Sequence, residues 1–139
     1  VKTRNGATTV MAQANGTFDV KLEPQHPSDQ AQAAMLGRMT IDKQFSGDLE
    51  AGSTGEMLAA MTGVEGSAGY VALERVTGTL HGRRGSFFLQ HNGIMARGVQ
   101  KLEIAVVPDS GTEELATLAG KMMILVEDGE HRYEFTYSL

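Results

Sequence analysis

The sequence contains no cysteine and no tryptophan, and only three of its 139 residues are proline. Without cysteine the chain cannot form a disulfide, use a thiol as a nucleophile or bind a metal through thiolates. No segment approaches the roughly 20 apolar residues that a membrane-spanning helix needs. The fold must therefore be held together by an apolar core, which a chain of this length can form as a single domain.

Basic residues are outnumbered, with 12 Lys and Arg against 17 Asp and Glu, for a net charge of −5. A surface of this sign repels phosphate backbones, so nucleic-acid binding is not expected. The sequence also lacks a phosphate-binding glycine loop, a Gly-x-Ser-x-Gly nucleophile motif and metal-ligand spacing among its four histidines. We expect no cofactor, no metal, no membrane partner and, by default, a cytoplasmic location.

Glycine is abundant, with 17 residues, and apolar residues recur with a period of two. Phe18, Val20 and Leu22, for example, alternate with polar residues. This alternation, interrupted by glycine-rich turns, is typical of strands joined by hairpins. It predicts strands over 17–23, 35–50, 54–62, 68–81, 86–92, 98–107, 121–126 and 131–139, with a loop over 24–34 and one short helix over 112–118.

The predicted order of elements indicates an all-β fold. No helical crossover joins any two strands, so the sheet is antiparallel, and a meander of about eight strands leaves two free edges unless it closes. We therefore predict a single up-and-down β-barrel over residues 15–139. Residues 1–14 are predicted to be a flexible N-terminal extension, of which residues 1–10 are either an addition upstream of the native start or a native disordered arm.

The candidate site comes from the hairpin around Arg83 and Arg84. A turn over 82–85 places Leu80 opposite Phe87 and Val76 opposite His91. The more apolar face, expected inside the barrel, then carries Tyr70, Ala72, Glu74, Val76, Gly78, Leu80, Phe87, Leu89 and His91. Glu74 and His91 are diagonal neighbours in this register, close enough for their side chains to meet.

A carboxylate and an imidazole in an apolar interior can act as an acid–base pair, so Glu74 and His91 are the catalytic candidates. Residues 47–58 resemble 78–89, which predicts a second hairpin with its turn at 51–53 and Glu56 pointing inward. The predicted ligand-binding residues are Glu56, Tyr70, Glu74, Phe87, Leu89 and His91. The competing interpretation is that Glu74 and His91 form a structural ion pair without a ligand.

Four blocks of the sequence resemble a bacterial family of unknown function. They are Phe45-Ser-Gly-Asp-Leu-Glu50, Leu73-Glu-Arg-Val-Thr-Gly-Thr-Leu80, Gly85-Ser-Phe-Phe-Leu-Gln-His-Asn-Gly93 and Val107-Pro-Asp-Ser-Gly-Thr-Glu-Glu-Leu115. That family has a fold similar to the allene oxide cyclase barrel. The resemblance implies an eight-stranded barrel but no function, and no catalytic residue is carried over because the active-site pattern of the cyclases has no match here.

Three functions are compatible with these sequence features. The one we favour is the binding of a small apolar molecule inside the barrel, near Glu74 and His91. The second is a cofactor-free enzyme of the isomerase or cyclase type, which uses the same cavity. The third is a structural homo-oligomeric module, in which outward apolar residues form an interface; these residues are Met57, Met61, Val71, Leu73 and Phe88.

Overall fold

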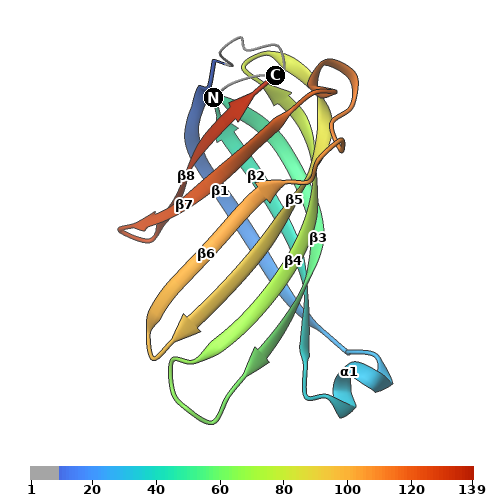
Figure 1. Ribbon diagram of the computed structural model, residues 1–139, viewed down its shortest axis with the longest axis vertical. Coiled ribbons are helices and arrows are strands. Elements are labelled where there is room, and N and C mark those ends of the chain that lie inside the picture. The colour runs from blue at the N-terminus through green and yellow to red at the C-terminus, as the bar shows by residue number, and fades with distance from the viewer. Residues whose placement is uncertain (1–9) are drawn as a thin grey trace.

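The structure, a computed structural model, describes residues 10–139 and forms a closed barrel of eight antiparallel strands (Figure 1). Each strand pairs with the next in the chain and β8 pairs with β1, as the predicted fold class requires. The strands are β1 (Ala12–Gln25), β2 (Gly37–Gly47), β3 (Leu49–Met61), β4 (Ala68–Leu80), β5 (Arg83–Ala96), β6 (Val99–Val106), β7 (Ala119–Glu127) and β8 (Glu130–Ser138).

The first strand begins within the segment predicted to be a flexible extension. β1 starts at Ala12, where it pairs with Tyr137 of β8, and Ala14 is completely buried. Residues 12–14 are therefore part of the barrel wall. Residues 1–9 of the predicted extension lie outside the described residues.

The turn between β2 and β3 corrects the prediction of one long strand over 35–50. The chain reverses at Gly47 and Asp48, and the predicted turn at 51–53 lies inside β3. Gly47 has a φ of +107°, a conformation that residues with a side chain rarely adopt. This conformational requirement, and not the resemblance between the two segments, determines where the hairpin turns.

The turn between β4 and β5 also differs from the prediction. It consists of His81 and Gly82, whose φ angles are 46° and 79°, so Leu80 pairs with Arg83 and Val76 with Phe87. Two consecutive positive φ angles match the twist of a tight hairpin. The predicted turn at Arg83 and Arg84 is wrong, but the register is offset by an even number of residues. The predicted inward face is therefore correct.

Two short helical segments also differ from the prediction. The helix expected over 112–118 is a single 3-10 turn, η1 (Glu113–Leu115), whose Leu115 is buried in the core. The predicted loop over 24–34 contains α1 (Asp29–Ala33), which Ser28 caps by accepting a hydrogen bond from the backbone N–H of Ala31 at 3.2 Å. Polar residues in a connecting segment can close a helical turn when a serine supplies the cap.

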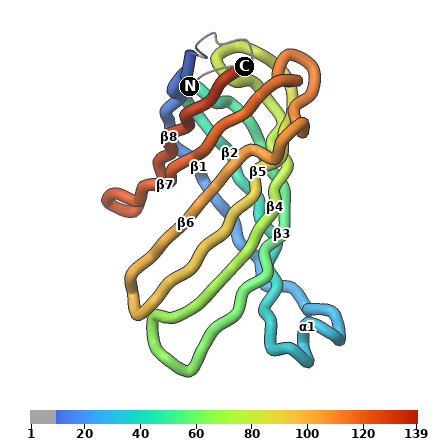
Figure 2. Tube along the Cα trace, in the orientation of Figure 1, coloured from blue at the N-terminus to red at the C-terminus, as the bar shows by residue number. Residues whose placement is uncertain are grey.

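The two ends of the barrel are built differently. β6 and β7 pair only through Ile104–Met122 and Ala105–Lys121, and Figures 1 and 2 show the β7–β8 hairpin turning away from β6 beyond this point. The end that holds β7, β8 and η1 is closed by large buried side chains, namely Phe45, Leu49, Leu80, Phe87, Leu115, Tyr133 and Phe135. β7 and β8 do not extend to the end near α1, which we call the open end of the barrel (Figure 1).

Tyr133 holds the closed end together. Its hydroxyl accepts a hydrogen bond from the backbone N–H of Leu49 at 2.9 Å and donates to the carbonyl of Ser46 at 3.0 Å. The ring needs a glycine beside it, because a Cβ at Gly16 would lie 2.5 Å from the hydroxyl and 2.0 Å from the Ser46 carbonyl oxygen. Tyr133 thus joins β8 to the β2–β3 turn across the bare backbone of β1.

We predict that Gly16→Ala destabilises the barrel by about 1–3 kcal/mol, because the added methyl group displaces Tyr133 or the Ser46 carbonyl. The matched control is Gly37→Ala, where the nearest atom to an added Cβ is 3.9 Å away. This control should be neutral or slightly stabilising. Urea unfolding of the two variants tests the prediction, and equal midpoints would contradict it.

Candidate functional site

Glu74 lies at the centre of the barrel wall and points inward, with only 1% of its surface exposed. Its carboxylate accepts three hydrogen bonds. Oε1 accepts from the hydroxyl of Ser53 at 2.8 Å. Oε2 accepts from Nζ of Lys43 at 2.8 Å and from Nε2 of His91 at 2.5 Å. We call these four residues the Glu74 cluster.

Four neighbouring strands each supply one residue of the Glu74 cluster. Lys43 of β2 is directly opposite Ser53 of β3, and both side chains are buried. On β5, Leu89 is opposite Glu74, and His91 lies two residues further along on the same face. The predicted contact between Glu74 and His91 is therefore confirmed. The predicted turn placed His91 opposite Val76, whereas it lies opposite Ala72, so it reaches Glu74 from the other diagonal position.

Sequence reasoning missed Lys43 and Ser53. The signal was present in the period of two, because Lys43 lies between Ile41 and Phe45, which are both buried. A basic residue at an inward position is a natural partner for a buried carboxylate. Ser53 could be found only with the correct β2–β3 turn, because the prediction placed it in a loop.

The Glu74 cluster keeps its carboxylate ionised. Burial alone would raise the pKa of Glu74, but the hydrogen bond from His91 and the charge of Lys43 outweigh it, and they lower that pKa from 4.5 to about 2. The ammonium of Lys43 also lies 5.1 Å from the centre of the Phe18 ring, within cation–π distance. A charged pair is thus stable inside an otherwise apolar barrel.

The other predicted site residues lie in three different places. Tyr70 is half-buried and near the Glu74 cluster, with its ring centre 6.4 Å from that of His91. Phe87 and Leu89 are buried in the apolar core. Glu56 is on the outer surface, paired with Arg38, so its predicted inward orientation is wrong. Because β3 runs unbroken from Leu49, Glu56 is seven positions further on and faces the opposite side.

A hollow of about 180 Å³ lies at the open end of the barrel. Tyr70 and Gly93 line this hollow. They are the next inward residues after Ala72 on β4 and His91 on β5, so the hollow lies next to the Glu74 cluster. Gly93 leaves room for the Tyr70 ring, since a Cβ there would lie 2.2 Å from a ring carbon. The lining residues are Met57, Ala59, Met61, Ala68, Gly69, Tyr70, Gly93, Ile94, Met95 and Gln100.

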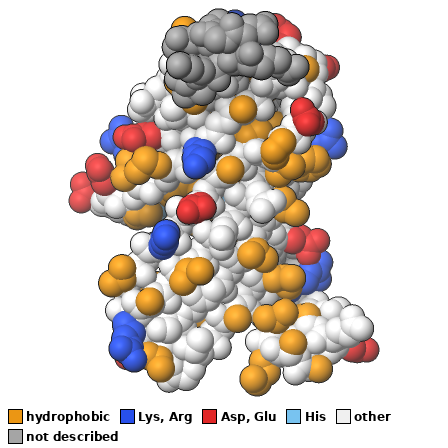
Figure 3. Space-filling model, viewed as in Figure 1, with side chains coloured by type: hydrophobic (Ala, Val, Ile, Leu, Met, Phe, Trp, Pro, Cys, Tyr) orange, Lys and Arg blue, Asp and Glu red, His pale blue; other side chains and the backbone are white. Residues whose placement is uncertain are grey.

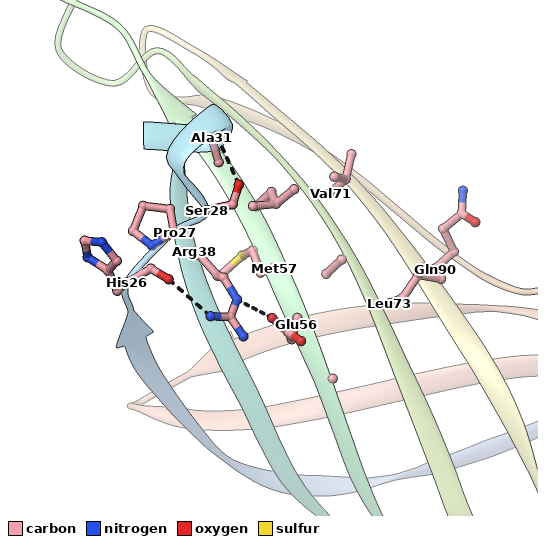
Figure 4. Close-up of a pocket in the computed structure, with 13 residues that line it drawn as sticks. His26, Pro27, Ser28, Ala31, Arg38, Glu56, Met57, Val71, Leu73 and Gln90 are labelled. Atoms are coloured by element: carbon pink, nitrogen blue, oxygen red, sulfur yellow. Dashed lines mark hydrogen bonds and ion pairs between the residues drawn. The ribbon is translucent and has the colours of Figure 1, made fainter. Parts of the chain in front are cut away.

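A larger groove, of about 830 Å³, lies on the outer surface beside α1 (Figure 4). His26 and Pro27 line one side and Val71 and Leu73 the other, with Arg38 and Glu56 between them. Arg38 donates hydrogen bonds to Glu56 and, at 3.2 Å, to the carbonyl of His26. The hydrogen bond from Arg38 lowers the pKa of Glu56.

The outer face of β3, β4 and β5 carries several exposed apolar side chains. Val71, Leu73 and Phe88 are 55%, 53% and 41% exposed, in agreement with their predicted outward orientation. Met57 and Met61 were also expected outside, but both line the interior hollow, and Met57 is half-buried. In the view of Figure 3, hydrophobic side chains alternate with charged side chains of both signs.

Neither a metal centre nor a membrane-spanning helix is found in the part of the chain that the structure describes. No group of three or more His, Asp or Glu side chains in residues 10–139 is arranged to hold a metal ion. None of the helices formed by these residues is long and apolar enough to span a membrane.

The barrel extends over nearly the same residues as a known protein family. A family model described as "Protein of unknown function (DUF3224)" matches residues 14–137. The chain belongs to the DUF3224 family. The resemblance to a bacterial family of unknown function is thereby confirmed, whereas the likeness to the allene oxide cyclase barrel stays a prediction.

A solved structure of a DUF3224 protein from Shewanella oneidensis MR-1 is similar to this chain. The two are 53% identical, the TM-score is 0.88, and the match covers 94% of this chain and 98% of the Shewanella chain. The description of that structure gives its function as unknown. No curated protein matches the chain. The function must therefore be inferred from the site.

We predict that Glu74→Gln destabilises the fold by about 3–5 kcal/mol, because the ammonium of Lys43 then stays buried without a carboxylate. Replacing both residues, in Lys43→Met with Glu74→Gln, should cost less than Glu74→Gln alone. Chemical unfolding of the single and double variants measures this coupling. The surface control Glu56→Gln should change stability by about 1 kcal/mol or less, and a similar loss in that control would contradict the assignment.

The acid dependence of stability should also depend on Glu74. A carboxyl whose pKa falls from 4.5 to about 2 on folding stabilises the barrel above pH 4.5, and this stabilisation is lost as the pH falls towards 2. The difference in unfolding free energy between wild type and Glu74→Gln should therefore be constant above that range and shrink within it. Urea titrations at a series of acidic pH values test this, and a difference independent of pH would refute it.

Proposed function

We propose that the protein binds a small, mostly apolar molecule in the hollow at the open end of the barrel. The observation that carries this proposal is the position of the hollow, which opens on one side to solvent and on the other approaches the buried Glu74 cluster. An apolar cavity with a few polar groups at one end is the usual form of a small-molecule site.

The size of the hollow favours a ligand with one ring or a short chain. An engineered apolar cavity of about 150 Å³ in another protein is large enough to bind benzene. The hollow here is slightly larger, at about 180 Å³. Three of its lining residues are methionines, whose flexible side chains can adapt to ligands of different shape.

The divergence of β6 and β7 supports the same proposal. A barrel with hydrogen bonds around its whole circumference would have to open a ladder to admit a molecule at its side. Here the ladder between β6 and β7 ends after two residue pairs. A ligand can therefore enter at the side, where β6 and β7 are not paired, while the other seven ladders stay intact.

The alternative functions rest on other features. A cofactor-free isomerase or cyclase would use the same hollow and the acid–base chemistry of Glu74 and His91. A homo-oligomer would use the outer face, where Val71 pairs with Leu58 across the strands and both are exposed. The enzyme alternative shares the hollow but has no further feature that favours it over binding, and the homo-oligomer has no feature as specific as the hollow, so both stay predictions.

We expect methylbenzene to bind in the hollow, which can be measured with ¹³C-methyl-labelled methionine. The chain contains 8 methionines, and Met57, Met61 and Met95 line the hollow. Their NMR signals should shift in a saturable way, whereas Met35 and Met123, which are exposed and not part of its lining, should not respond.

A pair of matched variants completes this experiment. Ala59→Leu fills the hollow and should abolish the shifts, whereas Ala60→Leu adds the same side chain on the opposite face of β3 and should leave them unchanged. Uniform shifts of all methionines, or binding that survives Ala59→Leu, would overturn the proposal.

A further inference from the structure

The Glu74 cluster fixes the proton on one side of the His91 ring. An ionised carboxylate can only accept hydrogen bonds, so Nε2 of His91 carries the hydrogen that is donated to Glu74 at 2.5 Å. In a neutral imidazole the other nitrogen then has no hydrogen and presents a lone pair. In the neutral form of the His91 ring, the buried carboxylate thus makes Nδ1, and not Nε2, the hydrogen-bond acceptor.

This acceptor is not used within the described part of the chain. Nδ1 of His91 has no hydrogen-bond partner among residues 10–139, although His91 is only 5% exposed. In the same residues no fully enclosed side-chain nitrogen or oxygen lacks a partner. Nδ1 must therefore keep part of the small exposed surface of the residue, in an otherwise buried setting.

The interior hollow begins at the next inward residues along both strands. On β5 the next inward residue beyond His91 is Gly93, which has no side chain. On β4 the next inward residue is Tyr70, whose ring covers Gly93 and lines the hollow. The half-buried Tyr70 ring, whose centre lies 6.4 Å from that of His91, therefore lies between His91 and the hollow.

We propose that the Tyr70 ring moves aside when a ligand enters the hollow, that Nδ1 of the neutral His91 ring then becomes its polar anchor, and that the ligand is a small apolar molecule bearing a hydroxyl group. This inference rests on the proposed function and adds the chemical class of the ligand. A hydroxyl can donate to Nδ1, whereas an ether or carbonyl oxygen would set its lone pairs against that of the nitrogen. A ligand without a donor also leaves a desolvated acceptor unpaired, which is what gives hydrogen-bonding sites their selectivity.

The proton position can be measured without any ligand. In protein labelled with ¹⁵N-histidine, long-range ¹H–¹⁵N correlation spectra at neutral pH should show Nε2 of His91 as protonated and Nδ1 as unprotonated. The reverse tautomer, or a ring protonated on both nitrogens, would overturn the inference whatever the protein binds.

The ligand class is tested with phenol and methoxybenzene, which differ in the hydroxyl hydrogen. We expect phenol to bind the wild-type protein about tenfold more tightly, the effect of one hydrogen bond to an otherwise unpaired acceptor. His91→Gln should weaken this preference, because the glutamine amide nitrogen can still donate to Glu74 while its carbonyl oxygen, the remaining acceptor, does not occupy the position of Nδ1. The control His131→Gln, which replaces a ring packed against Phe18, should keep the preference.

The outcomes separate the two proposals. If both compounds bind the hollow with equal affinity, the hydroxyl inference is wrong and the proposed function stands. If neither compound binds, the proposed function fails, and the choice of ligand class fails with it. If His91→Gln does not fold, the wild-type spectra decide, because phenol should shift the Nδ1 signal of His91 and methoxybenzene should not.

Discussion

A single buried carboxylate constrains the middle of this barrel. Taking the charge of Glu74 out of water is costly unless it is paired and hydrogen-bonded. Lys43, Ser53 and His91 meet that requirement only if β2, β3, β4 and β5 hold one particular register. A slip of even two residues along one ladder would keep the inward face apolar but would separate the charges. The cluster therefore specifies the pairing of four strands more tightly than apolar packing alone could.

The Glu74 cluster also divides the interior into two regions with different packing. On one side, large aromatic and aliphatic side chains fill the space, and Tyr133 ties the strand ends together. On the other side, methionines and Tyr70 line a hollow that reaches solvent. The same carboxylate that stabilises the first region orients His91 at the border of the second. Stability and the proposed binding thus depend on the same residue, so a substitution of Glu74 would change both.

The sequence was sufficient to predict the barrel and half of its polar cluster. Alternation with a period of two identified the inward face of β4 and β5. This assignment is correct although the turn was misplaced, because the register was wrong by an even number of residues. The error at the turn between β2 and β3 had a larger effect. The prediction merged the end of β2 with the start of β3, which placed Glu56 on the wrong face and Ser53 in a turn. Left-handed residues such as His81 cannot be recognised from alternation, because the tertiary structure imposes their conformation. The hollow is lined by residues of β3, β4, β5 and β6 that are far apart in the sequence, so no local pattern records it.

The short ladder between β6 and β7 has a mechanical consequence. A fully hydrogen-bonded barrel has a radius fixed by its number of strands and their stagger. In this barrel the ladder between β6 and β7 fixes the radius only near Ile104 and Ala105. The diameter at its free rim is set by side-chain packing, so it can differ between proteins that have the same strand count and topology. The number of strands therefore does not determine the size of molecule that such a barrel admits.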